Sequence, residues 1–177
     1  MEDRELIRRI QHGQKEYLND IAKKYYDDIF YFCCYQAGSR EDAYDLAQET
    51  FVRFIRYVEH YRYQNLKGYL LAIAMNLCRN YIREKSQAPV LQEEPDRPAP
   101  HTLAGASPER SLILAEALQK LPDIQREAVL LHHFYGYKNR EIAHMTGASH
   151  AAVKSRIRQG LAKLHQLLSK EDFYGES

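Results

Sequence analysis

Residues 139–164, NREIAHMTGASHAAVKSRIRQGLAKL, predict two helices joined by a tight turn. Gly147 stands at the turn, where a positive φ favours glycine, and Ser149 follows in the position of an N-cap. Ala143 precedes the glycine by four residues, and Val153 follows it by six. A small residue at the helix crossing and an apolar residue in the second helix, at this spacing, are typical of a helix-turn-helix motif.

The second helix of this motif has one apolar face and one bare, basic face. The apolar side chains recur at steps of three and four residues: Val153, Ile157, Leu161, Leu164 and Leu168. The other face carries the small or uncharged Ala151, Ala152, Ser155 and Gln159, so it could enter a major groove about 12 Å wide. From residue 140 to residue 170, six Lys and Arg stand against one Glu, a local charge of +5 in a chain of net charge +1. The pattern predicts duplex DNA as the ligand of this face.

The composition of the 177 residues is typical of a soluble protein, with 45% hydrophobic and 28% charged residues. No apolar run reaches the roughly 18 residues that a membrane span needs, and the charged start MEDRELIRRIQHG does not resemble a secretion signal. We therefore expect a cytoplasmic protein with no membrane insertion of its own. Its three cysteines, Cys33, Cys34 and Cys78, are expected to be reduced, buried and without a metal.

The prolines divide the chain into two parts. Five of the six prolines lie between Pro89 and Pro108, in a stretch with no helical or strand period. Glu93, Glu94 and Asp96 make this stretch acidic. We expect a helical domain over residues 1–86, a flexible linker over 87–107, a second helical domain over 108–170 and a tail over 171–177. Because neither part shows strand alternation, the expected fold class is all-α, with two small helical domains.

The N-terminal domain is expected to hold four helices. ELIRRIQHG predicts a short helix with Leu6, Ile7 and Ile10 facing inward, and residues 14–38 predict one long amphipathic helix. The third helix, SREDAYDLAQETFVRFIRYVEHY, begins after Ser39 as its N-cap, and LKGYLLAIAMNLCRNYIREK is the fourth. In the C-terminal domain, Pro108 and Pro122 are each expected at a first helical position.

Two surfaces of opposite charge are expected on the N-terminal domain. Asp42, Asp45 and Glu49 lie at steps of three and four residues, so they share one stripe of a helix. An acidic stripe suits a basic protein partner and not DNA. The residues that follow are basic and aromatic, a combination that suits unpaired bases: Tyr61, Arg62, Tyr63, Lys67, Tyr69, Arg79, Tyr81, Arg83 and Lys85. Each tyrosine could equally be a core residue.

Three segments resemble regions of the bacterial sigma factors of the sigma-70 family, in the order of that family. DAYDLAQETFVRF resembles region 2.2, and NLKGYLLAIAMNLCRNYIREK resembles regions 2.3 and 2.4. LPDIQREAVLLHHFYGYKNREIAHMTGASHAAVKSRIRQGLAKL is similar to region 4. With only a linker in place of region 3, the chain resembles the extracytoplasmic-function (ECF) group. The resemblance implies a promoter-specificity subunit of RNA polymerase, with neither catalytic activity nor a cofactor.

The resemblance also implies roles for matching positions. The β′ clamp helices of core RNA polymerase would be bound by Asp42, Asp45, Gln48 and Glu49. The −10 element of promoter DNA would be bound by Tyr61, Arg62, Asn65, Lys67, Tyr69, Asn76, Arg79, Asn80 and Arg83. The −35 element would be bound by Arg140, Ser149, His150, Ala151, Lys154, Ser155, Arg156 and Arg158. The β flap of polymerase and an anti-sigma factor would be further partners.

Three places depart from the family pattern. Tyr69 stands where the family usually has Trp, which reduces the area for stacking. Residues 159–161, Gln-Gly-Leu, stand where Arg-Ala-Arg is frequent, so two phosphate contacts would be missing. His132 and His133 replace an apolar-Arg pair and have no metal partner at a suitable spacing, so they are expected to be surface or packing residues.

Two other kinds of function were weighed against a sigma factor. A free-standing helix-turn-helix regulator, with an N-terminal sensing domain, would bind its duplex tightly without polymerase. An enzyme would need a site that the sequence does not offer, because it has no phosphate-cradling glycine loop, no metal cluster and no nucleophile beside a base. The sigma factor is the main hypothesis, and the free-standing regulator is the alternative.

Overall fold

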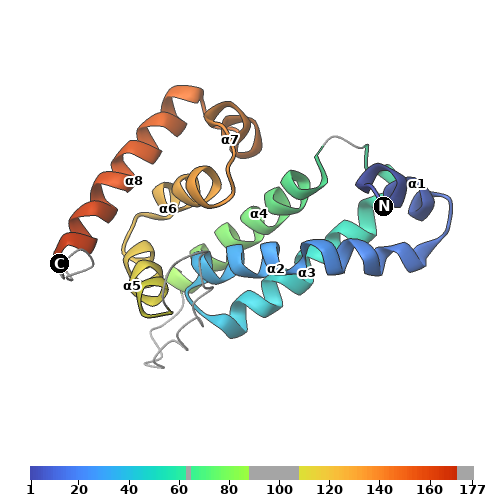
Figure 1. Cartoon of the computed structure of the whole chain (residues 1–177), viewed down its shortest axis with the longest axis horizontal. Helices are drawn as coiled ribbons and strands as arrows, with labels where there is room; N and C mark the ends of the chain where they lie inside the picture. Colours follow the sequence, from blue (N-terminus) through green and yellow to red (C-terminus); the bar gives the residue numbers. More distant parts are fainter. Residues whose placement is uncertain (63–64, 88–107, 171–177) are drawn as a thin grey trace. The chain divides into compact units, whose positions relative to one another are not determined.

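The computed structural model describes residues 1–62, 65–87 and 108–170. Within these ranges the chain forms helices and turns and no strand, and it divides into two compact units. Unit 1 contains helices α1 to α4, and unit 2 contains helices α5 to α8 (Figure 1). The predicted all-α fold with two small helical domains is confirmed. The expected linker and tail lie outside the described residues, except for Gln87, which is the last residue of α4.

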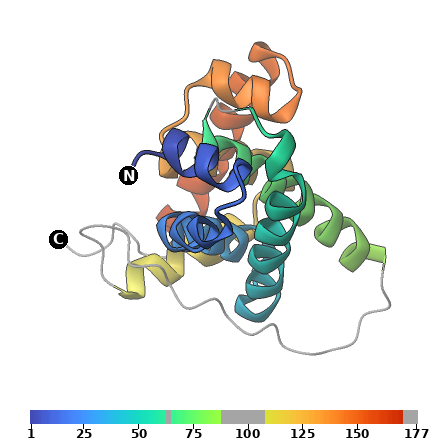
Figure 2. The same ribbon diagram turned by 90° about the vertical axis from the view of Figure 1, so that its right-hand side faces the viewer.

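Unit 1 is built on the pairing of α2 with α4, and α1 lies against α2 and the turn η2 (Figures 1 and 2). Its elements are α1 (Asp3–Gln11), η1 (Lys15–Tyr17), α2 (Leu18–Ala37), α3 (Arg40–Tyr57), η2 (Val58–His60) and α4 (Leu66–Gln87). The predicted inward residues of α1, Leu6, Ile7 and Ile10, are all buried. Ile29 of α2 and Leu71 of α4 have no exposed surface, so the 3.6-residue period of the sequence corresponds to a real core.

Two helix boundaries in unit 1 differ from the predictions. The single helix expected over residues 14–38 is divided into the 3₁₀ turn η1 and the helix α2. The Tyr17 hydroxyl accepts a hydrogen bond from Arg9 Nη1 at 2.7 Å, which holds this turn against α1 before α2 begins. The third helix ends at Tyr57, and Val58 is buried in the separate 3₁₀ turn η2.

Unit 2 packs α5, α6 and α7 against the long helix α8. Its elements are α5 (Pro108–Gln119), α6 (Asp123–Val129), η3 (Leu130–Phe134), α7 (Asn139–Thr146) and α8 (His150–Lys170). Pro122 lies just before α6 and not at its first helical position as expected, and α6 continues directly into the π-helical turn η3. The His132 Nδ1–H donates to the Tyr137 carbonyl at 2.8 Å and holds the chain beyond this turn.

The turn between α7 and α8 has the predicted geometry. Gly147 has a φ of 72°, in the left-handed region that favours glycine. Ser149 caps α8, since its Oγ accepts a hydrogen bond from the Ala152 backbone N–H at 3.1 Å. At the start of α7, the Lys138 backbone N–H donates to Glu141 Oε1 at 3.0 Å. Side-chain hydrogen bonds therefore satisfy backbone N–H groups at the start of both helices of the motif.

Candidate functional site

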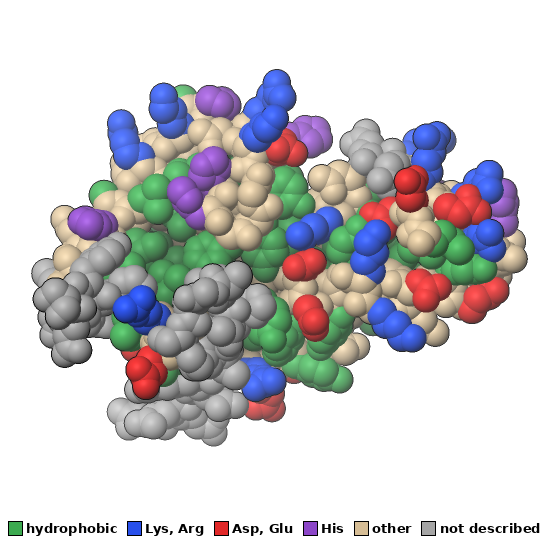
Figure 3. Space-filling model, in the orientation of Figure 1, with side chains coloured by type: hydrophobic (Ala, Val, Ile, Leu, Met, Phe, Trp, Pro, Cys, Tyr) green, Lys and Arg blue, Asp and Glu red, His purple; other side chains and the backbone are tan. Residues whose placement is uncertain are grey.

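The outer face of α8 is exposed and basic. Ala151, Lys154 and Arg158 are exposed, whereas Ser155 and Arg156 are half-buried. Ala151, Ser155 and Arg158 follow one another at steps of four and three residues, so they lie on one stripe of the helix. Figure 3 shows Lys and Arg side chains, with histidines among them, over the end of unit 2 that α7 and the start of α8 form. The Lys and Arg residues of this face stand among small residues, so the helix can approach the floor of a major groove closely.

The other predicted residues of this face lie around the start of α8. His150 is the first residue of α8 and is exposed, and Arg140 is exposed on α7. In the part of the chain that the structure describes, neither Lys154 nor Arg158 is in an ion pair. Gln159 differs from the prediction, because its Oε1 accepts a hydrogen bond from Gln125 Nε2 of α6 at 3.2 Å. This side chain therefore belongs to the edge where α8 meets α6.

The inner face of α8 approaches α6 very closely at Gly160. A Cβ at this position would lie 2.7 Å from Val129 Cγ2 and 3.3 Å from the Gln125 carbonyl oxygen. Val153 and Ile157 are buried on the same side, while Leu161 is half-buried. The glycine that departs from the family pattern thus has a structural reason, since this packing leaves no room for a side chain.

The four acidic and polar residues predicted on α3 do not lie in one environment. Asp45 and Gln48 are exposed, and Glu49 forms an exposed ion pair with Arg53 at 3.2 Å. Asp42 instead accepts a hydrogen bond from the Tyr81 hydroxyl of α4. Burial, and then this hydrogen bond, raise the pKa of Tyr81. Asp42 therefore ties α3 to α4 as part of the framework of unit 1.

Exposed apolar side chains stand among these acidic residues. Tyr44, Val52 and Ile55 are 53%, 45% and 48% exposed, all on α3. None of the three was among the residues predicted for a partner surface. All three fall outside the buried stripe of α3, which contains Ala47 and Phe54, so the helical period places them on the exposed side. The surface of α3 is therefore acidic and apolar together, a combination that suits a protein partner.

The tyrosines predicted at the −10 surface form an aromatic cluster. The ring centroids of Tyr61 and Tyr69 lie 4.6 Å apart, and both rings pack against Phe54 at 6.2 and 6.3 Å. Tyr61 is buried and Tyr69 is half-buried. The cluster joins α3 to α4 and is a core feature whose edge reaches the surface at Tyr69. Tyr63 lies outside the described residues.

The polar residues of the predicted −10 surface are largely bonded within unit 1. Asn65 caps α4, since its Oδ1 accepts a hydrogen bond from the Gly68 backbone N–H at 3.1 Å. Lys67 pairs with Asp28 of α2 at 3.6 Å, and Arg83 donates to Asn80 Oδ1. Arg62 and Asn76 are exposed, and Arg79 is half-buried. The structure therefore brings the predicted residues to α4 and to the residues just before it.

The cysteines and histidines do not assemble a metal centre in the described ranges, where no group of three potential ligands occurs. Cys33, Cys34 and Cys78 are buried free thiols. A hydrogen bond between Cys33 and Cys78, together with burial, raises the pKa of the Cys33 thiol. The His132 and His133 rings contact edge to face at 4.7 Å, and burial followed by the neighbouring His132 lowers the pKa of His133. None of the described helices has the length and apolarity needed to cross a membrane.

Comparison with known proteins places both units in one family. The sigma-70 region 2 family matches residues 21–88, which cover α4, α3 and most of α2. The sigma-70 region 4 family matches residues 111–164. The chain is 30% identical to the ECF RNA polymerase sigma factor EcfG of Rhodopseudomonas palustris, with 77% of this chain and 78% of the relative aligned. The chain belongs to the sigma-70 family of sigma factors, in its ECF group.

A further relative and a solved structure extend this comparison. The chain is 30% identical to the ECF sigma factor SigE of Mycolicibacterium smegmatis over 86% of its own length, and it spans 62% of that relative. The sigma factor RpoE of Bartonella quintana, solved in complex with the anti-sigma factor NepR, has the same fold, with a TM-score of 0.71 and 21% identity. The alignment covers 85% of this chain and 96% of RpoE. Region 2 of this ECF family member therefore carries the α3 and α4 surfaces, and region 4 carries the α8 face.

Proposed function

We propose that this chain binds core RNA polymerase and directs it to promoters through their −10 and −35 elements, with no catalytic activity of its own. The observation that carries the proposal is the surface of α3, where exposed Asp45 lies on the same helix as exposed Tyr44, Val52 and Ile55. Such a surface suits a protein partner with basic and apolar groups. We assign it to the β′ clamp helices of polymerase, with Gln48 and Glu49 as further contacts. Asp42 would hold α3 in place through its hydrogen bond with Tyr81 of α4. The β flap is proposed as a second polymerase contact.

We assign DNA recognition to the other two surfaces. The outer face of α8, with Lys154, Arg156 and Arg158, would bind the −35 duplex. The α4 surface and the residues before it, with Arg62, Tyr69 and Arg79, would bind the −10 element once its strands are separated. An anti-sigma protein is proposed as a regulatory partner, because the related RpoE was solved with one. Covering the α3 surface would be sufficient for such a protein to block polymerase.

Charge reversal on α3 tests the polymerase assignment. Asp45→Lys with Glu49→Lys should weaken binding to core polymerase by more than a hundredfold, because like charges at a complementary interface cost several kcal/mol. The ion pair lost between Glu49 and Arg53 is exposed and contributes little to folding. The control is Glu16→Lys with Asp27→Lys, which changes the charge equally at exposed acids outside α3. If the α3 variant assembles holoenzyme with unchanged affinity, the assignment to the clamp helices is wrong.

Promoter binding with and without polymerase separates this function from a free-standing regulator. The two units must contact two DNA elements more than one helical turn apart. The linker expected from the sequence over residues 87–107 has about 20 residues, and a flexible chain of that length would span on the order of 25 Å. The free protein should therefore bind promoter duplex weakly, since its second contact forms at low effective concentration. Gel shifts at one salt concentration provide the measurement, and equal affinity of the free chain and the holoenzyme would favour the regulator.

A further inference from the structure

Gln11, the last residue of α1, makes two long-range hydrogen bonds with its side-chain amide. Its Nε2 donates to the Val58 carbonyl at 2.9 Å and to the Tyr61 carbonyl at 2.7 Å. The two carbonyls lie at the beginning of η2 and directly after it, and the Tyr61 backbone N–H also donates to the Val58 carbonyl at 3.1 Å. The two N–H bonds of a planar amide diverge at a fixed angle. One side chain therefore sets the direction of the backbone at both ends of η2.

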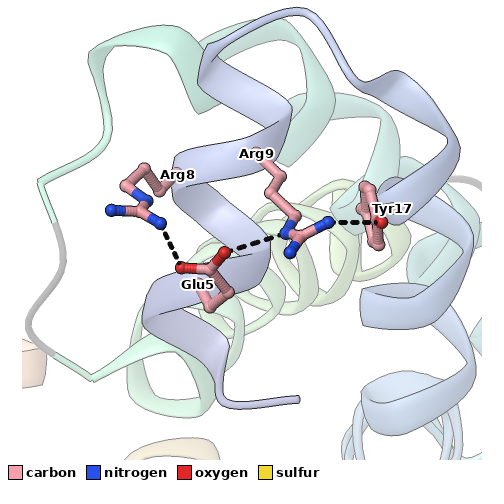
Figure 4. A network of polar contacts seen from close by, with 4 residues as sticks. All are labelled: Glu5, Arg8, Arg9 and Tyr17. Carbon is pink, nitrogen blue, oxygen red and sulfur yellow. Dashed lines mark hydrogen bonds and ion pairs between the residues drawn. The ribbon is translucent and has the colours of Figure 1, made fainter.

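The helix that carries Gln11 is itself held in place. Arg9 lies between Glu5, at 2.8 Å, and the Tyr17 hydroxyl, at 2.7 Å, and Glu5 also pairs with Arg8 at 2.8 Å (Figure 4). The hydrogen bond from Arg9 lowers the pKa of Glu5. On the other side of α1, Leu6, Ile7 and Ile10 are buried. The helix that carries Gln11 is thus held in place, and the hydrogen bonds of Gln11 hold η2 at a fixed position relative to α1.

The segment that Gln11 holds leads directly into the predicted −10 surface. The Tyr61 ring packs against Tyr69 and Phe54, and Arg62 is the next residue along the chain. Three residues after Arg62, Asn65 caps α4. The backbone is therefore fixed before Arg62 by a contact from α1 and fixed again at Asn65 by the helix that it starts.

We propose that Gln11 is a positioning residue for binding of the unpaired −10 strand. Its amide fixes the backbone at Val58 and Tyr61, so that Arg62 and the exposed edge of Tyr69 are in place before DNA arrives. A flexible single strand loses entropy on binding, and order already present in the protein lowers the total cost. This inference rests on the proposed function. The match to sigma-70 region 2 begins at residue 21, so α1 and Gln11 lie outside the matched segment.

The test compares holoenzymes that carry different residues at position 11. Gln11→Met keeps the length of the side chain and removes both donors, while Gln11→Lys keeps donors within reach of the two carbonyls. The probe is fork-junction DNA from a promoter that the wild-type holoenzyme selects from random fragments, duplex through −35 and single-stranded at −10. A duplex fragment with the −35 element alone is the second probe. Gln14→Met and Gln14→Lys are the controls, because Gln14 is exposed and its side chain caps nothing at η1.

We expect Gln11→Met to weaken binding of the fork probe about three- to tenfold, the size expected for one or two net hydrogen bonds. Binding of the −35 duplex and of core polymerase should stay within twofold, and Gln11→Lys should recover fork binding beyond any gain that Gln14→Lys shows. If Gln11→Met impairs folding, Gln11→Asn, which withdraws the amide by one methylene, should show the same selective loss. Unchanged fork binding in a folded variant, or equal loss with Lys and Met, would overturn the inference alone. A wild-type chain that fails to assemble with polymerase would overturn the proposed function as well.

Discussion

On α8 of unit 2, Lys154 and Arg158 lie on an exposed helix face. In the proposed −10 surface of unit 1, by contrast, Asn65 and Lys67 are bonded to their neighbours. The duplex at −35 is a preformed and stiff ligand, so cations on a well-anchored helix are sufficient to bind it. The strand at −10 is flexible once unpaired, and the protein must supply the order that the ligand lacks. The stiff duplex is met by exposed side chains, whereas the flexible strand is met by side chains that are already held in place.

The largest expected effect on stability comes from the buried side of α8. Gly160→Val should destabilise unit 2 by about 2–3 kcal/mol, because the new side chain would overlap Val129 and the Gln125 carbonyl. Hydrogen exchange of α8 peptides in the intact chain should accelerate, and −35 binding should fall although no exposed cation has changed. Ala162→Val, at an exposed position of the same helix, is the control. Equal behaviour of the two variants would mean that the exposed face does not depend on this contact.

A smaller effect is expected at the tie between α3 and α4. Tyr81→Phe removes the hydroxyl that donates to Asp42 and accepts from Lys85, and it should cost unit 1 about 1–2 kcal/mol, since the lost donor serves a partly buried carboxylate. Exchange should accelerate in α3 and α4 peptides and stay unchanged in α8 peptides. Tyr57→Phe, at an exposed tyrosine, controls for loss of a hydroxyl. If the two substitutions have the same effect, the ordered framework of unit 1 does not need this bond.

A single cation on α8 should matter less. Arg158 lies eight residues beyond His150, about 12 Å along the helix axis, which favours a phosphate contact over a base contact. Arg158→Ala in the holoenzyme should weaken −35 binding by about 1 kcal/mol for every sequence and reduce the salt slope by about one. Lys163→Ala, which removes the same charge further along α8, is the control. A loss confined to certain base pairs would instead assign Arg158 to base readout.

The smallest expected effect concerns pH and unit 2. Burial and His132 lower the pKa of His133, so below its ordinary pKa of about 6.5 the unfolded chain binds more protons than the folded chain. This contribution to stability is fully present above pH 7 and is lost as the pH falls toward the lowered pKa. His133→Gln should therefore reduce the loss of stability between pH 7 and pH 5, measured by exchange in unit 2. His144→Gln, at an exposed histidine of α7, is the matched control, and an identical pH dependence in both variants would contradict the assignment.

Much of the fold follows from local pattern. The buried faces of α1 and α8, the left-handed Gly147 and the Ser149 cap were all predicted from spacings of at most six residues. The acidic and basic surfaces of unit 1 were predicted in the same way. Such features are accessible from sequence because a helix repeats every 3.6 residues, and a cap or turn depends only on its immediate neighbours.

The rest was decided by contacts between segments that are distant in the sequence. Gln11 lies 47 and 50 residues from the carbonyls that it binds, and Asp42 lies 39 residues from Tyr81. Nothing in the local pattern of Asp42 distinguishes it from exposed Asp45, because the two differ only in which helix packs beside them. The close approach at Gly160 likewise depends on Val129 of another helix. The sequence by itself determined where helices form and which faces are apolar or charged, while the tertiary structure decided which polar groups hold the framework and which remain available to a partner.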